Sequence, residues 1–295
     1  GPAPLVGGDA GDIADRLVER MDSGHWRIFN LGALLFARRL ADFGSLGRKA
    51  LRLVRYHGSD RLSAHPEPAF PQGYAVAYEP VIQTLHGWLP GNEAIGKALR
   101  KDVRMYPDVA IRELVANALI HQDLSVTGTS PLVELLDDRL EISNPGAPLV
   151  DTERLLDTPP RSRNEAMASM MRRMNVCEER GTGVDKVVGG CELYQLPAPQ
   201  FEATDGFTRS ILFAMRPLTR MEPRERIRAV YWHACLRHVN GQVTNNATVR
   251  KRFAIADANS AIASRLLKEA ETAGVIRIFD TDAAPKLRRY VPSWA

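Results

Sequence analysis

The sequence predicts an α/β protein, and three observations carry that prediction. Apolar residues recur at helical spacing over residues 107–121, two short strands flank an Asp-Asp turn within 132–143, and a further strand follows at 209–217. Helices that alternate with strands in this way are typical of a sheet covered by helices. We therefore expect a central α/β sandwich over residues 106–216.

Two further units flank the central one. We expect residues 12–105 to form an N-terminal α/β segment and residues 217–295, after a proline-bounded linker, to form a C-terminal winged helix. Residues 1–11 are rich in Gly, Ala and Pro, so we expect them to be disordered. Gly1-Pro2 resembles a protease scar, which suggests that the natural chain continues upstream.

The expected elements follow from the same patterns, with Gly and Pro marking many of their ends. In the N-terminal segment they are a helix over 12–22, an apolar helix over 30–44, a strand within 49–58, a loop over 59–74 and a helix over 80–90. In the central unit they are the helix 107–121, strands 132–136 and 139–143, a Met-rich helix 164–175, a Gly-rich turn opening into a helix at 181–196 and the strand 209–217. In the tail they are helices 223–239, 244–253 and 258–273 and wing strands 275–279 and 287–292.

The composition fits a folded protein of the cytoplasm. Apolar residues make up 44% of the 295, and no apolar run approaches the roughly 20 residues of a membrane span, so we expect no membrane partner. The three cysteines form no CxxC pair, which argues against a zinc cage or a disulfide framework. Net charge is +4, but from Arg220 onward fourteen Lys and Arg stand against seven Asp and Glu, so the tail is expected to meet a polyanion.

The helix 107–121 carries a polar stripe beside its apolar one. Glu113, Asn117 and His121 follow one another at intervals of four, which places all three on one face. Two other short segments combine polar groups with glycine. They are the strand end Asn144-Pro145-Gly146 and the helix start Gly181-Thr182-Gly183.

Together these segments resemble the Bergerat (GHKL) fold, the ATP-binding fold of type II topoisomerase ATPase subunits, heat-shock chaperones, histidine kinases and mismatch-repair ATPases. The resemblance implies ATP and Mg²⁺ as cofactors. It implies that Asn117 holds the metal and that Glu113 orients or deprotonates the attacking water. By the same resemblance, the strand end with Asn144 and Gly146 touches the adenine, and the turn at 181–183 wraps the phosphates.

The chemistry of a nucleotide site suits these residue types. Mg²⁺ takes oxygen ligands, and an amide oxygen supplies one without adding charge beside a polyanion. Water that attacks a γ-phosphate needs positioning more than covalent help, and glycines at a helix N-terminus let backbone N–H groups approach phosphate oxygens. We also expect Lys186 to neutralise charge, and Arg163 and Asn164 to form part of a lid.

A closer resemblance is to bacterial proteins labelled RecG-related, or ATP-binding transcriptional regulators, in which a Schlafen/AlbA-type domain precedes the Bergerat-like module. It covers roughly residues 25–216, and the tail fits the winged helix often appended. We find no Walker A motif, so the helicase label is taken as misleading. The matching stretches, in chain order, are AIRELVANALIHQDLS, DDRLEISNPG, RSRNEAMASMM and EERGTGVDKV.

The chain also departs from the family pattern. Asn144 stands where relatives usually carry Asp, and an amide lacks the charge that strengthens the adenine contact. Gln122 replaces an Arg common after the helix, and the glycine loop is short, so we expect nucleotide binding rather than efficient turnover. Plainer interpretations stay open: Glu113 as a first-turn acid favoured by the helix dipole, His121 as a structural residue, and both glycine segments as ordinary turns.

For the tail we expect contact with DNA phosphates. Helix 258–273 has balanced charge, which makes it a weaker reader of the DNA groove. The alternative is a solvated basic surface or a dimerisation domain. The expected phosphate contacts lie on helix 244–253 and on the wing and are Arg250, Lys251, Arg252, Lys286, Arg288 and Arg289.

Two hypotheses of function follow. The first is an ATP-binding, DNA-associated regulator whose conformation or self-association responds to nucleotide and Mg²⁺, with slow hydrolysis if any and a homo-oligomeric state. The second is a non-enzymatic assembly or dimerisation module with a degenerate nucleotide pocket. Asn144 in place of Asp is the feature on which the choice depends.

Overall fold

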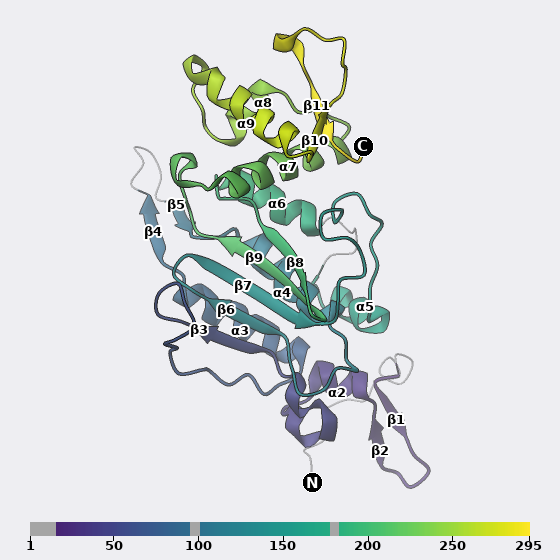
Figure 1. Cartoon of the computed structure of the whole chain (residues 1–295). Helices are drawn as coiled ribbons and strands as arrows, with labels where there is room; N and C mark the ends of the chain where they lie inside the picture. Colours follow the sequence, from purple (N-terminus) through teal and green to yellow (C-terminus); the bar gives the residue numbers. More distant parts are fainter. Residues whose placement is uncertain (1–15, 95–100, 178–182) are drawn as a thin grey trace.

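A five-stranded mixed sheet forms the centre of the protein, in a computed structural model that describes residues 16–94, 101–177 and 183–295. The order across the sheet is β3-β6-β7-β9-β8, with β3 parallel to β6 and the other neighbours antiparallel (Figure 1). This sheet and the helices behind it confirm the predicted α/β class. The strands are β3 (Arg52–Arg55), β6 (Leu132–Leu135), β7 (Arg139–Pro145), β8 (Gln200–Thr204) and β9 (Phe207–Phe213).

Helices α3 and α4 lie behind the sheet in the view of Figure 1. Alternate residues of the strands, such as Val133, Leu140 and Leu212, turn to this side and are buried in one core with Ile111 and Leu119 of α4. The apolar stripe predicted for α4 therefore faces the sheet, which directs its polar stripe to the side. The helices of this part are α2 (Asn30–Phe36), α3 (Tyr74–Trp88), α4 (Asp108–His121), α5 (Glu165–Arg173) and α6 (Gly183–Leu193).

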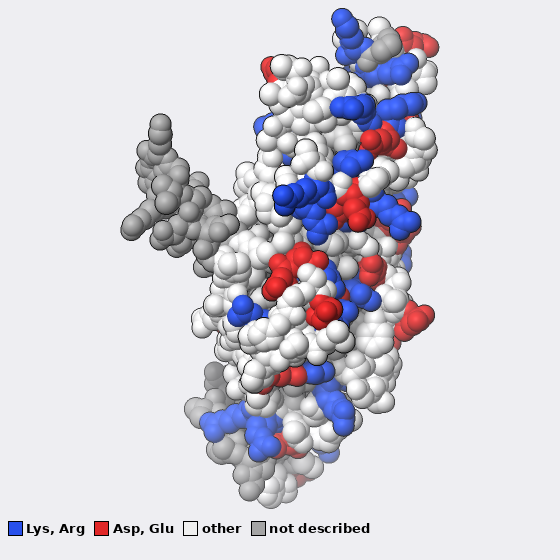
Figure 2. All heavy atoms as spheres, turned by 60° about the vertical axis from the view of Figure 1, so that its left-hand side comes forward, with Lys and Arg blue, Asp and Glu red and all other residues white. Residues whose placement is uncertain are grey.

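The opposite face of the sheet is polar and held by ion pairs across the strands. Glu141 is buried there, and its carboxylate lies 2.6 Å from the Nε of Arg139 and 2.5 Å from a guanidinium nitrogen of Arg61. Arg61 also pairs with Glu134 on β6, and Arg209 on β9 reaches Glu141 at 3.4 Å. Acidic and basic side chains interleave over the middle of the face shown in Figure 2.

The C-terminal region contains the three helices and two strands expected from the tail sequence. A capping box joins Glu222 and Glu225 at the start of its first helix, and Pro223 occupies the first turn. The region has its own core, which includes Val230, Leu266 and other side chains from all three helices and both strands. Its elements are α7 (Pro223–Val239), α8 (Asn246–Arg252), α9 (Ser260–Thr272), β10 (Ile276–Ile278) and β11 (Tyr290–Pro292).

The N-terminal segment is where the sequence-based assignment was wrong. A helix was expected over 12–22, but Val18–Arg20 forms strand β1, which pairs with β2 (Trp26–Ile28) across a turn in which Gly24 has a φ of +78°. The helix expected over 30–44 ends at Phe36, because Ala37 takes an extended ψ of 139°. Short 3-10 turns follow it at Leu40–Asp42 and Gly44–Lys49.

The structure also differs from the expected elements at the start of one helix and at three strands. Helix α3 begins at Tyr74, six residues before the expected start, and keeps Pro80 inside it. Strand β8 and the antiparallel pair β4 (Gly91–Ala94) and β5 (Lys101–Arg104) were not expected. Residues 1–11, which were expected to be disordered, lie outside the described part of the chain. Within the described part, no helix has the length and apolar character needed to cross a membrane.

Candidate functional site

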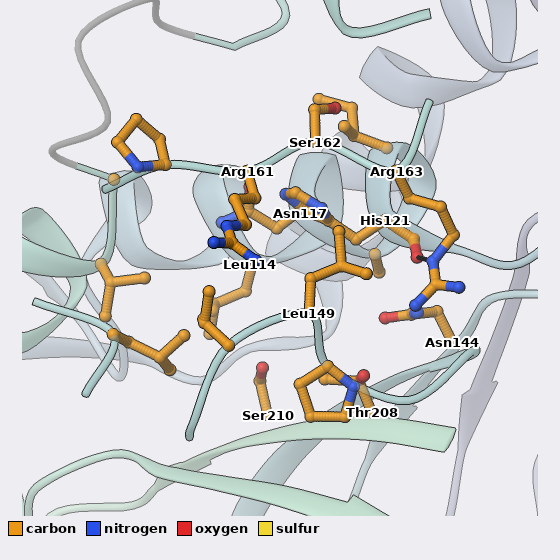
Figure 3. A pocket seen from close by; sticks show the side chains of 18 of the residues that line it. Leu114, Asn117, His121, Asn144, Leu149, Arg161, Ser162, Arg163, Thr208 and Ser210 are labelled. Atoms are coloured by element: carbon orange, nitrogen blue, oxygen red, sulfur yellow. Dashed lines mark hydrogen bonds between the residues drawn. The ribbon is translucent and has the colours of Figure 1, made fainter. Parts of the chain in front are cut away.

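A cavity of about 420 Å³ opens between the polar stripe of α4, the sheet and the segment 147–163 (Figure 3). Its volume falls within the range of small-molecule sites. Helix α4 contributes Glu113, Asn117 and His121, and α6 contributes Gly183 at its start. The strands contribute Asn144 on β7 and Thr208 and Ser210 on β9.

Glu113, Asn117 and Gly183 converge at one place in the wall of this cavity. The amide nitrogen of Asn117 donates to Oε1 of Glu113 at 3.2 Å. A Cβ added to Gly183 would lie 1.8 Å from the same carboxylate oxygen, so only glycine allows Glu113 to sit against the start of α6. Two of the three segments singled out in the sequence therefore meet. Gly181 and Thr182 lie outside the described residues.

The strand end at Asn144 brings in the third segment. Asn144 is 4% exposed, and its amide nitrogen donates to the carbonyl oxygen of Pro145 at 3.1 Å, which leaves the amide oxygen to face the cavity. Thr208 lies opposite it on β9, and its hydroxyl donates to the carbonyl oxygen of Gly146 at 2.8 Å. Gly146 has a φ of +108°, and a side chain there would crowd Asp123.

Arg163 and Asn164 fasten the end of α4 to the segment that covers the cavity. Arg163 donates to the carbonyl oxygen of His121 at 3.0 Å and to that of Ala147 at 2.5 Å (Figure 3). The amide of Asn164 donates to the carbonyl oxygens of Ile120 and Gln122, both at 2.8 Å. These bonds satisfy carbonyl groups that a helix end leaves without partners.

Arg163 and Asn164, which were predicted to form part of a lid, therefore bind carbonyl groups at the end of α4 instead. Arg163 lines the cavity, but its guanidinium is committed to backbone oxygens and lies 3.5 Å from Asp123. Neither Asn164 nor Lys186 is among the described residues that line the cavity. Because Lys186 sits outside the wall, its predicted role beside the phosphates has no support from the geometry.

His121 lines the cavity as a neutral side chain. Burial, and after it the positive charge of Arg163, lowers the pKa of the imidazole below its ordinary value of 6.5. A neutral imidazole can donate or accept a hydrogen bond but adds no charge to the site.

Sequence reasoning missed several residues of the cavity. Arg161 and Arg172 line it from the segment before α5 and from α5 itself. The apolar wall was not predicted either. Its members come from β8 and the segment 147–160, which had no recognisable motif, and from Val184, which directly follows the glycine turn that was singled out. This wall includes Leu149, Val150, Leu155, Val184 and Phe201.

One predicted DNA contact is wrong, and the structure gives the reason. Arg252 is 4% exposed and donates to the carbonyl oxygen of Leu196 at 2.7 Å, so α8 buries it against the central unit. Its Nε lies 3.6 Å from Glu192 on α6, and burial lowers its pKa. A guanidinium enclosed in this way cannot reach a DNA phosphate.

The other predicted phosphate contacts are in varied settings. Arg250 is paired with Asp257 and also donates to Asn246 at 3.0 Å, whereas Lys251 is exposed. On the wing, Lys286 and Arg289 are exposed, and Arg288 is half-buried.

Comparisons with known proteins bear on the central unit. Residues 128–212 match the family model described as "Putative ATP-dependent DNA helicase recG C-terminal". A solved structure, that of the DIP2311 protein from Corynebacterium diphtheriae, is similar over 92% of this chain with 19% identity and a TM-score of 0.58, and the chain spans 55% of that protein's length. No curated protein matches.

The family model indicates an ATPase-like module over the matched residues, and the solved structure supports the α/β fold. The matched stretch contains Asn144, Arg163 and Gly183, while Glu113 and Asn117 precede it. An ATPase-like module implies nucleotide binding, and the donor set suits the metal that usually accompanies a nucleotide. The amide nitrogen of Asn117 is held by Glu113, so its oxygen is the atom that remains for a hard cation.

Proposed function

We propose that the cavity binds ATP together with Mg²⁺ and that this binding controls a DNA-associated regulator of the RecG-related type. The observation that carries the proposal is the meeting of Glu113, Asn117 and Gly183 in the wall of a cavity that also holds Asn144. The Bergerat fold, which the sequence resembles, uses a helical Glu and Asn followed by a glycine loop in this order along the chain for ATP, although its strand end usually carries Asp where this chain has Asn144.

The proposed orientation places the base near β7 and the phosphates near α4. The free amide oxygen of Asn144 can accept one hydrogen bond from an exocyclic amine, and the apolar wall at Leu149 and Ile142 can pack against a ring. Asn117 would hold the metal, which when bound neutralises charge on the phosphates.

Glu113 has the position of a base for slow hydrolysis. Its carboxylate lines the cavity and is fixed by Asn117 and by the close approach of Gly183, so it could orient a water molecule or accept its proton. We expect the turnover to be slow, because the amide at Asn144 gives a neutral and therefore weaker contact to the base.

For DNA, the exposed cations of the C-terminal region supply the proposed contact. Arg265 and Lys268 lie on the exposed face of α9, whereas Glu269 turns toward α7, where Arg226 lies 3.3 Å from it. Lys268 is paired with Glu271 at 3.1 Å, so Arg265 is the cation on which a groove contact of α9 in a winged helix would rest. Lys and Arg are also prominent over the C-terminal end in Figure 2.

The contact between the two parts offers a route for nucleotide control. Leu155, Val184 and Phe201 line the cavity and also pack in the cluster that holds Trp232 of α7. A ligand that shifts these walls would change how the C-terminal region docks. We also propose that the same change drives self-association of the protein.

A thermal-shift experiment tests the proposed function. A ligand that binds only the native state raises the midpoint of unfolding, so Mg-ATP should raise it by several degrees and Mg-GTP by less. No shift with millimolar ATP for the folded protein would overturn the proposal and favour a non-enzymatic assembly module. Asn144, which stands where relatives usually carry Asp, is the observation that favours this second function.

A further inference from the structure

Three arginines from one stretch of chain line the cavity, and they differ in what they bind. Arg163 is committed to two backbone oxygens and lies near Asp123. Arg161 and Arg172 make no side-chain hydrogen bond or ion pair with any other residue that the structure describes. Two guanidinium groups with free N–H donors in one cavity are therefore available to a ligand.

Both groups line the cavity that Glu113 and Asn117 also line. The pKa of the Cys177 thiol is raised to about 11 by burial and then by the charge of Glu113, while the charge of Arg172 acts on it in the opposite sense. Glu113, Arg172 and Cys177 all line this cavity, and the charges of Glu113 and Arg172 both act on the thiol. Figure 3 shows Arg161 extending into the cavity on the side of Asn117.

Charge balance requires cations at this position if an anion is to enter. Glu113 and Glu165 both line the cavity, and either would repel a polyphosphate. Lys186 is not in the wall, and the guanidinium of Arg163 is already occupied. Arg161 and Arg172 are the remaining basic side chains among the described lining residues.

We propose that Arg161 and Arg172 form an anion subsite that binds the polyphosphate of the nucleotide directly. The planar guanidinium matches phosphate oxygens with paired N–H donors, and such charge-assisted hydrogen bonds are stronger than neutral ones. This inference rests on the proposed function, since it assigns the phosphate end of the same site. It implies that nucleoside diphosphates bind appreciably even without a divalent cation.

The test is a titration series by calorimetry with adenosine, AMP and ADP in the presence of EDTA. For the wild-type protein, ADP should bind at least about tenfold more tightly than adenosine, since one good charge-assisted contact is worth roughly a factor of ten. Arg161→Ala and Arg172→Ala should each remove most of that preference and leave the affinity for adenosine unchanged. Arg161→Lys and Arg172→Lys should restore part of it.

Arg173→Ala is the matched control, because Arg173 follows Arg172 on α5 but does not line the cavity. It should leave both affinities as they are. Equal binding of adenosine and ADP by the wild type, or equal effects of the Arg172 and Arg173 variants, would overturn the anion subsite while ATP binding still stood. Failure of every adenine compound to bind the folded wild type, with or without Mg²⁺, would instead overturn the proposed function and the subsite together.

Discussion

In the cavity, residues that are far apart in the sequence lie together, whereas in the C-terminal region consecutive residues lie in different surroundings. Glu113 and Gly183 are 70 positions apart in the chain, yet the carboxylate of one lies against the backbone of the other. Arg250, Lys251 and Arg252 are consecutive, yet the first is paired on the surface, the second is exposed and the third is buried between two parts of the molecule. A run of like charges is therefore a poor guide to a binding surface, because successive helical residues point in different directions.

A substitution at Gly183 should disrupt the cavity most, because Glu113 lies directly against this residue. Gly183→Val would place side-chain atoms where the carboxylate of Glu113 now lies, so the response of thermal stability to ATP should disappear. The free energy of unfolding should change less, because the displaced carboxylate is the end of a flexible side chain that borders the cavity. Gly189→Ala, on the same helix, is the control, because its Cβ would meet only Leu236 at 3.8 Å. A full ATP response in the Gly183 variant would contradict the assigned geometry.

The buried charge between the two parts should have the largest effect on the free energy of unfolding, although it does not touch the ATP response. Glu192→Ala removes the carboxylate near Arg252, which it approaches at 3.6 Å, and the partner of His233 at 3.1 Å. An uncompensated buried guanidinium should lower the free energy of unfolding by about 3 kcal/mol. In urea unfolding, Glu271→Ala should change it by less than about 0.5 kcal/mol, because it disrupts only a pair with the exposed Lys268. Equal costs for the two variants would argue against a buried ion pair.

DNA binding sharpens the contrast among the basic residues of the tail. Replacing exposed Lys286 and Arg289 with Ala should weaken binding to a duplex and lower the slope of log affinity against log salt by about two. Arg252→Met, which removes a buried cation, should leave that slope unchanged. Fluorescence anisotropy over a salt series measures both. A slope that drops for the Arg252 variant alone would reverse the assignment.

The smallest effect concerns pH. His121 stays neutral in the folded state because burial lowers its pKa, whereas the unfolded chain takes up a proton below about 6.5. The unfolded state thus binds more protons at acidic pH, and the contribution of His121 to stability should decrease as the pH falls below 6.5. His121→Gln should flatten the pH dependence of the unfolding free energy below about pH 6.5. A curve parallel to that of the wild type would show that His121 does not titrate in this way.

The sequence predicted local features well where one element carries all the information. The bounds of α7 matched because its cap, its first-turn Pro223 and its end at Asn240 are all local signals. The spacing of Glu113 and Asn117 on α4 likewise fixed their shared face. Strand β8 was missed because Gln200–Thr204 is short and only its pairing with β9 defines it. The N-terminal strand pair was missed for the same reason.

From the sequence, only those residues of the site that belong to a recognisable motif could be predicted. Asn144 and Gly183 were found because they belong to recognisable segments, and both line the cavity. Arg161 and Arg172 have no local signature, since nothing in the sequence shows that they lack partners or face inward. The burial of Arg252 depends on the packing of α8 against the central unit, which no single segment specifies.

The most direct test of the central claim is a crystal structure with a nonhydrolysable ATP analogue and Mg²⁺. We predict the base beside Asn144 and Thr208, and the phosphates between Asn117 and the two arginines Arg161 and Arg172. An analogue bound outside this cavity, or one whose phosphates point away from Asn117, would contradict the account.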